Sequence, residues 1–388
     1  MIHAGPGAGK TLGALASFKT LKNEGRVSKC LIFCHRKSIL SQWSQASKDL
    51  GLQIGQIFNN DLEKVDFRNI DGYVISYQGA AKRANDIRRI IEELHLEDLM
   101  VIADEAHHLG LDPEEPDAQI WGQSFSQITS GCLIRVGLTG TPFRADNLAF
   151  CSAKRIKFKH NGINTEQITP DLCIEPIDLI SQGDVRPLEF HFQDGFIDHK
   201  YENKTEVEKS FLSQEIRESW RARNLRRAIK VSDSSSIAMH LLLRAKKKLD
   251  QVRNFHGNAA GLVIAKDISH AISIRNILQE NGDSVEIVHS QNRDSSTQLE
   301  NFEFKQSKWL VSVDMCSEGF NAPRLRVVAY LTTVATKNRF LQGITRTVRM
   351  SKQRELIETI PRSPSYVFAP ADPLLMEYAR SWSISEPY

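Results

Sequence analysis

The sequence lacks a long hydrophobic run, a cysteine framework and an excess of charge of one sign. No apolar stretch approaches the roughly 20 residues that cross a bilayer, and the N-terminus has no basic segment followed by an apolar one, as a secretory signal would. The six cysteines are scattered along 388 residues, so disulfides are not expected to hold the chain together. These absences predict a cytoplasmic protein without a membrane partner.

The composition is that of a folded globular protein. Hydrophobic residues make up 41% and charged residues 25% of the chain, which excludes a mostly disordered protein. The net charge of +3 neither requires nor excludes nucleic acid, because a basic groove can lie on a nearly neutral protein. Cys30 and Cys34 are close in sequence, but no second ligand pair has zinc spacing, so core packing is expected. The length predicts two domains.

Short β-branched runs alternate with helical stretches, which indicates α/β architecture with parallel sheets. The expected strands are 30–34, 73–77, 99–103, 133–138, 261–265, 285–288, 309–313, 326–331 and 365–369. Residues 186–255 are charged and helical in pattern, with no strand-like run. The expected division is therefore a first domain at 1–185, a helical connecting segment at 186–255 and a second domain at 256–388.

The stretch AGPGAGKT at residues 4–11 has the pattern of a loop that binds phosphate. Gly7 and Gly9 let the backbone approach the phosphates, and the loop opens a helix whose N-terminus attracts anions. Lys10 would contact the outer phosphates, and the Thr11 hydroxyl would bind Mg²⁺. The first position of the strict pattern is Ala4 instead of glycine. This loop alone fits a kinase, a GTPase and a motor equally well.

An apolar run leads directly into DEAHH at 104–108, which places two carboxylates where ligands bind in open α/β sheets. Asp104 would hold Mg²⁺ through water, and Glu105 would orient or deprotonate the water that attacks the terminal phosphate. The chain has neither an Asn-Lys-x-Asp motif nor the HRD and DFG motifs of protein kinases, which argues against a GTPase or a kinase.

Further segments resemble, in order, the motifs of superfamily-two helicases of the DEAD/DEAH-box group related to the type III restriction enzyme motor subunit. Residues 31–43, 73–80 and 138–146 look like motifs Ia, Ib and III, and the segment from Gly261 looks like motif IV. Residues 311–326 and 340–349 look like motifs V and VI. The resemblance covers nearly the whole chain.

The resemblance implies two RecA-like domains with ATP in the cleft between them and nucleic acid across both. Arg346 and Arg349 lie three residues apart, so we expect them on one helix face, with Arg349 as the arginine finger. Gln342 is expected to contact His107 or the attacking water, so that nucleotide state is linked to domain closure.

The remaining expected site residues couple nucleotide to nucleic acid or bind one of them. Motif III supplies Thr139 and Thr141 for coupling, together with His107. Motif V supplies Gly319 near the ribose and the interface, and has Asn321 where an aspartate is commoner. The expected contacts to phosphates and sugars, with little sequence specificity, are Arg36, Gln78, Arg144 and Ser312.

Two departures from the family leave a second interpretation open. Only three residues precede Ala4, so the segment that recognises adenine is expected to be missing, and Thr345 replaces a glycine of motif VI. The first interpretation is an ATP-dependent helicase or translocase, with DNA a better candidate than RNA, of prokaryotic or phage origin. The alternatives are a nucleic-acid-binding protein with a degenerate ATPase, or the motor of a restriction or defence complex that translocates without unwinding. A nuclease or a defence or repair protein is a possible partner.

Overall fold

The computed structural model contains two parallel-sheet α/β units that follow one another along the chain. Contacts divide it into Met1–Glu175 and Pro176–Tyr388, and each is described by itself. The structure describes residues 1–58, 65–93, 98–110, 117–140, 155–160, 163–200, 207–231, 236–289, 291, 295–313, 322–351, 354–355, 358–380 and 382.

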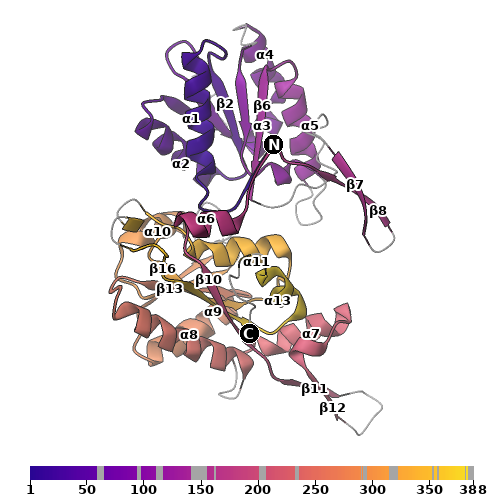
Figure 1. Ribbon diagram of the computed structural model, residues 1–388, viewed down its shortest axis with the longest axis vertical. Helices are drawn as coiled ribbons and strands as arrows, with labels where there is room; N and C mark the ends of the chain where they lie inside the picture. Colours follow the sequence, from indigo (N-terminus) through magenta and orange to yellow (C-terminus); the bar gives the residue numbers. More distant parts are fainter. Residues whose placement is uncertain are drawn as a thin grey trace. The chain divides into compact units, whose positions relative to one another are not determined.

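The first unit, which carries the N-terminus, is built on a parallel sheet flanked by helices (Figure 1). The sheet has seven strands in the order β3-β4-β2-β5-β6-β1-β9. Its strands are β1 (Ile2–Ala4), β2 (Cys30–Cys34), β3 (Ile54–Ile57), β4 (Gly72–Ser76), β5 (Met100–Ala103), β6 (Ile134–Thr139) and β9 (Leu172–Ile174). The helices are α1 (Lys10–Asn23), α2 (Lys37–Asp49), α3 (Tyr77–Lys82), α4 (Ala84–Glu93), α5 (Ala118–Thr129) and the 3-10 turn η2 (Ala106–His108). An antiparallel hairpin joins β7 (Arg155–His160) to β8 (Ile163–Ile168).

Apolar side chains alternate along the central strands and form one core on each face of this sheet. On one face, Leu15 and Phe18 of α1 and Trp43 of α2 pack against Cys30 and Cys34 of β2. On the opposite face, the core lies under α3, α4 and α5. Burial raises the pKa of both β2 thiols well above its usual range. These two cysteines are core residues, as expected.

The second unit has a six-stranded parallel sheet in the order β10-β17-β16-β13-β15-β14. Its strands are β10 (Leu188–Gln193), β13 (Ala260–Ala265), β14 (Val285–His289), β15 (Trp309–Val313), β16 (Leu325–Leu331) and β17 (Ser365–Pro370), and β11 (Phe196–Lys200) and β12 (Val207–Phe211) form a hairpin. The α-helices are α6 (Pro176–Gln182), α7 (Glu218–Ala228), α8 (Ile237–Arg253), α9 (Ile268–Glu280), α10 (Ser295–Asn301), α11 (Lys337–Ile344) and α13 (Pro373–Ala379). The 3-10 turns are η4 (Leu212–Gln214), η5 (Phe302–Phe304) and η6 (Thr345–Thr347).

The nine strands expected from the sequence are all present, within a residue or two of their expected bounds. The expectation that residues 186–255 contain no strand is wrong. In β10 the buried Leu188 and Phe190 alternate with more exposed polar residues, and the strand lies at the edge of the second sheet beside β17. Helix α8 packs on the same sheet. This stretch is therefore part of the second unit and not a separate connecting segment.

Among the described helices, none is both long and apolar enough to span a bilayer.

Candidate nucleotide site

The candidate nucleotide residues of the first unit follow the carboxyl ends of three neighbouring parallel strands. The phosphate loop follows β1, the acidic pair follows β5, and Gly140 follows β6. Because β5, β6 and β1 are adjacent and parallel, the sheet brings these segments to a single edge, where ligands of open α/β sheets bind. The sheet order thus unites residues that lie more than a hundred positions apart in the sequence.

The phosphate loop depends on two glycines in the left-handed region. Gly7 has φ 87° and Gly9 has φ 69°, values that disfavour a side chain, and Gly9 is the residue before α1 begins. A turn closes the loop, in which the Ala8 amide donates to the Gly5 carbonyl at 3.2 Å. The helix begins at Lys10, and no side chain caps its N-terminus, an end that attracts anions.

The Lys10 side chain folds back over the loop. Its Nζ donates to the carbonyl of Ala4 at 2.8 Å and lies 3.4 Å from that of Gly5. A Cβ added at Gly140 would lie 3.4 Å from the same Nζ, so Gly140 lies directly beside the lysine. This contact places Gly140, a residue of motif III, against the phosphate loop within one unit.

Asp104 is buried and held by the residues around it. The Trp43 indole donates to its Oδ2 at 3.0 Å, and the Glu105 amide donates to its Oδ1 at 3.1 Å. Burial and the charge of Glu105 raise the pKa of Asp104 to about 6, while the Trp43 bond and the charge of Lys10 act in the opposite direction. The influence of Lys10 on this pKa shows that the ammonium and the carboxylate share one electrostatic site.

Glu105 has a strained backbone. It has φ 49° and ψ 51°, and it is the single non-glycine residue with positive φ in the described part of the chain. A left-handed conformation costs roughly 1–2 kcal/mol in a residue with a Cβ, and such strain concentrates at functional sites. The side chain is 24% exposed, so its carboxylate remains accessible to solvent.

His107 links the acidic pair to motif III. Its Nδ1 lies 2.9 Å from Oγ1 of Thr139 and 3.4 Å from Oε2 of Glu105. All three residues belong to the first unit, and His107 and Thr139 are buried. Glu105 is therefore connected through His107 to Thr139, the last residue of β6.

Sequence reasoning missed a row of rings beside these residues. The rings of His107 and His108 have centroids 4.2 Å apart, and those of His108 and His35 are 3.9 Å apart. Trp121 continues the row at 5.5 Å from His35, and its ring is stacked 6.3 Å from that of Tyr77. The row joins motif II to residues within motifs Ia and Ib. His35 and Tyr77 do lie inside the segments quoted for those motifs, but no local spacing signals that their rings meet.

The expectation that Arg346 and Arg349 share one face of a helix is wrong. Helix α11 ends at Ile344, Arg346 lies in η6, and Arg349 follows in irregular chain. The Thr345 hydroxyl donates to the carbonyl of Leu341 at 2.6 Å, inside the last turn of the helix. Thr345 is therefore buried, with 1% of its surface exposed, and the end of the helix has room for its side chain.

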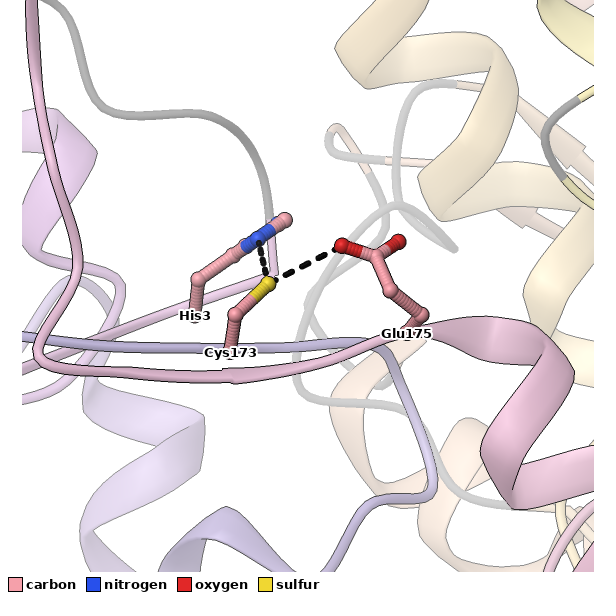
Figure 2. Close-up of side chains that lie close together, drawn as sticks. All are labelled: His3, Cys173 and Glu175. Carbon is pink, nitrogen blue, oxygen red and sulfur yellow. Dashed lines mark hydrogen bonds between the residues drawn. The ribbon is translucent and has the colours of Figure 1, made fainter.

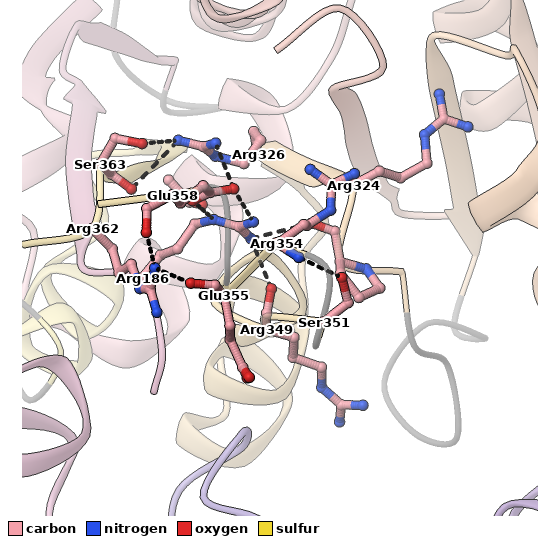
Figure 3. A network of polar contacts seen from close by, with 12 residues as sticks. Arg186, Arg324, Arg326, Arg349, Ser351, Arg354, Glu355, Glu358, Arg362 and Ser363 are labelled. Carbon is pink, nitrogen blue, oxygen red and sulfur yellow. Dashed lines mark hydrogen bonds and ion pairs between the residues drawn. The ribbon is translucent and has the colours of Figure 1, made fainter. Parts of the chain in front are cut away.

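The segment that carries both arginines is held by Arg186, a residue that sequence reasoning did not single out (Figure 3). The Arg186 Nη1 donates to the Arg349 carbonyl at 2.7 Å and to that of Pro323 at 3.1 Å, and its amide donates to the Val348 carbonyl at 2.9 Å. Glu358 binds the same guanidinium at 2.8 and 3.1 Å. Arg186 is fully buried, so this is a fixed anchor for residues 347–349.

Of the expected nucleic-acid contacts, the structure describes three. Gln78 is exposed on α3, and Arg36 is half-buried at the start of α2. Ser312 is 1% exposed within β15, paired with Ile264 and Val288 on the neighbouring strands. Ser312 is the fourth of the five residues of β15, and its burial gives no support to the expected contact with nucleic acid. The expected site residues outside the described part are Thr141, Arg144, Gly319 and Asn321.

Two protein-family models match this chain. Residues 1–144 match the type III restriction enzyme res subunit, and residues 233–351 match the conserved C-terminal domain of helicases. Together the two matches support a superfamily-two helicase, in the group similar to type III restriction enzymes.

The helicase fold recurs in solved structures. The ATP-dependent Type ISP restriction-modification enzyme LlaBIII bound to DNA superposes with a TM-score of 0.61 and 12% identity, over 98% of this chain and 28% of that one. Dbp5 of S. cerevisiae bound to RNA and ADP BeF3 gives a TM-score of 0.54 and 12% identity, over 100% of this chain and 84% of that one. These likenesses show two RecA-like units.

A curated relative from Mycobacterium leprae is 28% identical over 381 residues, which are 97% of this chain and 59% of that protein. The chain spans about 60% of the length of the curated relatives that it matches across nearly its whole sequence.

Proposed function

We propose that this helicase-family chain is an ATP-driven motor that moves along nucleic acid or unwinds it, with DNA as the better candidate. The observation that carries the proposal is the single sheet edge that gathers Lys10, Asp104 and Glu105. In this proposal the loop amides and Lys10 bind the phosphates of ATP. The present bonds of Lys10 to the loop carbonyls would give way to phosphate oxygens of higher charge.

The donor set of the site fits Mg²⁺. The Thr11 hydroxyl and the Asp104 carboxylate are oxygen ligands, which Mg²⁺ prefers, and Asp104 accepts one bond at each oxygen and keeps further lone pairs. These two residues would hold the ion, which would neutralise charge on the phosphates. Glu105 takes the role of base for the attacking water.

The roles of several further residues, in both units, belong to the proposal. Arg349, supported by Arg346, would stabilise charge on the phosphate in transfer, and Gln342 would contact His107 or the water. Gly319 and Asn321 would lie near the ribose, and Thr141 would share the coupling role of Thr139. Arg36, Gln78 and Arg144 would bind the nucleic-acid backbone. The expected cytoplasmic location stays part of this proposal.

The decisive test is ATP hydrolysis by the purified chain without nucleic acid and with single-stranded DNA, double-stranded DNA and RNA. We expect stimulation by DNA, and we expect Lys10→Ala and Glu105→Gln to abolish turnover. Lys19→Ala, an exposed lysine of the same helix, is the matched control and should hydrolyse ATP normally. Absence of hydrolysis under all four conditions would contradict the motor.

A degenerate ATPase is the alternative, and Thr345 in place of a glycine of motif VI is the departure that motivates it. It predicts nucleic-acid binding that is unchanged by Lys10→Ala, together with no turnover by the unmodified chain. A third reading, a translocase of a restriction or defence complex with a nuclease partner, is favoured by the match to type III restriction enzymes. Release of a labelled oligonucleotide from a duplex distinguishes unwinding from translocation alone.

A further inference from the structure

The edge of the first sheet carries three metal-ligating side chains that the proposed motor does not use. They are His3 on β1, Cys173 on β9 and Glu175 just after β9, and Figure 2 shows them converging. Potential ligand atoms of the three residues all lie within 4.8 Å of one another. His3 is half-buried, and the other two are exposed, so an ion can reach them from solvent.

The register of the sheet produces this cluster. β1 and β9 are parallel, with His3 directly opposite Cys173, so both side chains leave the same face. Glu175 is two residues beyond Cys173, and side chains two residues apart along an extended chain point the same way. Three ligands from two segments about 170 positions apart therefore meet without any distortion of the backbone.

The distances suit a small ion of tetrahedral preference. Nδ1 of His3 lies 3.3 Å from Sγ of Cys173, and that sulfur lies 3.0 Å from Oε1 of Glu175. Neighbouring ligand atoms around tetrahedral zinc are about 3.5 Å apart, given zinc bonds of about 2.0–2.3 Å. The two measured separations are shorter than this spacing by about 0.5 Å or less.

The ligand types select the ion. A thiolate and an imidazole favour Zn²⁺ and similar transition metals, whereas Mg²⁺ prefers oxygen ligands alone. In the ion-free cluster the Cys173 thiol donates to the Glu175 carboxylate, and metal binding would release that proton.

We propose that His3, Cys173 and Glu175 form a Zn²⁺ site whose fourth position is open to water. The site is separate from the Mg²⁺ position of the nucleotide and does not depend on the proposed motor activity. His3 directly precedes Ala4, whose carbonyl accepts from Lys10, so the ion would fasten the base of the phosphate loop to β9.

Cobalt substitution tests the site. The full 388-residue chain is titrated with Co²⁺ in the presence of excess Mg²⁺ and without nucleotide, and its absorption spectrum is recorded. We expect one equivalent to give the thiolate-to-cobalt charge-transfer band and the visible bands of tetrahedral cobalt, and Zn²⁺ to displace it. Cys173→Ser should remove the charge-transfer band, and His3→Ala should weaken binding at least tenfold.

The matched control is Cys132→Ser, which changes a half-buried cysteine of the same unit and should leave the spectrum unchanged. A stability measurement supplies a second readout: Zn²⁺ should raise the thermal midpoint of the unmodified chain and of Cys132→Ser, but not that of Cys173→Ser. The proposal is overturned if the unmodified chain gives no thiolate band, or if the band survives in Cys173→Ser.

Discussion

The phosphate loop of the first unit and the arginine segment of the second unit are held in different ways. Lys10 bonds to carbonyls five and six residues away, and the two loop glycines supply the backbone conformation themselves. Residues 347–349 instead receive bonds from Arg186, which is about 160 positions distant, and from the Ser365 hydroxyl. The conformation of the phosphate loop is therefore set by residues of the loop itself. Residues 347–349 instead depend on side chains that are distant in the sequence but belong to the same unit.

The largest effect is expected from Arg349→Ala. If the proposed motor is right, loss of the finger lowers the rate of ATP hydrolysis by roughly 10³–10⁵-fold, or about 4–7 kcal/mol of transition-state stabilisation. ATP binding, followed with a fluorescent nucleotide, should change little. Arg226→Ala, on the exposed face of α7, is the control and should retain the full rate. A nearly normal rate for Arg349→Ala would assign the role to another residue.

The next largest effect tests the long-range anchor. Glu358→Gln removes the carboxylate that faces Arg186 and Arg326, and the loss of one partner of a buried ion pair costs about 3–5 kcal/mol. The free energy of unfolding by urea measures this change.

An exposed pair provides the comparison for that measurement. Arg89 and Glu93 lie 3.4 Å apart on α4 with side chains 70% and 65% exposed, so Arg89→Ala should cost under about 1 kcal/mol. Equal costs for Glu358→Gln and Arg89→Ala would show that residues 347–349 are not anchored by the buried pair.

A smaller effect on stability distinguishes the backbone strain of Glu105 from its role in ATP hydrolysis. Glu105→Gly relieves the left-handed backbone and should stabilise the first unit by about 1 kcal/mol, less than the full strain because glycine gains freedom in the unfolded chain. It should abolish hydrolysis at the same time. Glu105→Gln keeps the strain, so it should lose hydrolysis without gaining stability. A thermal midpoint for Glu105→Gly no higher than that of Glu105→Gln would mean that the conformation is not strained.

The smallest effect is a dependence on pH. Burial by itself raises the pKa of Glu358, but bonds from Arg186 and the charges of Arg186 and Arg326 lower it below the ordinary value. A depressed pKa means that the stabilisation is fully present above the unfolded-state value of about 4.3 and is lost as the pH falls through the folded-state value. The stability difference between the unmodified chain and Glu358→Gln should therefore shrink below about pH 4. A difference that is constant down to pH 3 would contradict the assignment.

Much of the architecture could be predicted because its signals are local. Strands such as β2 and β5 are uninterrupted apolar runs, and Asp267 caps α9 by accepting from the amide of His270, three residues along the chain. β10 was missed because its polar residues interrupt the run, as is usual for an edge strand. The arginine segment was predicted as continuous helix because a spacing of three fits α-helix and 3-10 turn alike.

The sequence by itself determined the helicase motifs, their order, nine of the strands and the glycines that shape the phosphate loop, because each depends on neighbours a few positions away. Only the tertiary structure decided that Arg186 anchors the segment of Arg349, that rings join His107 to Tyr77, and that His3 faces Cys173. The physical reason is that sheet order and register bring together side chains that are far apart along the chain. No periodic pattern in the sequence identifies such pairs.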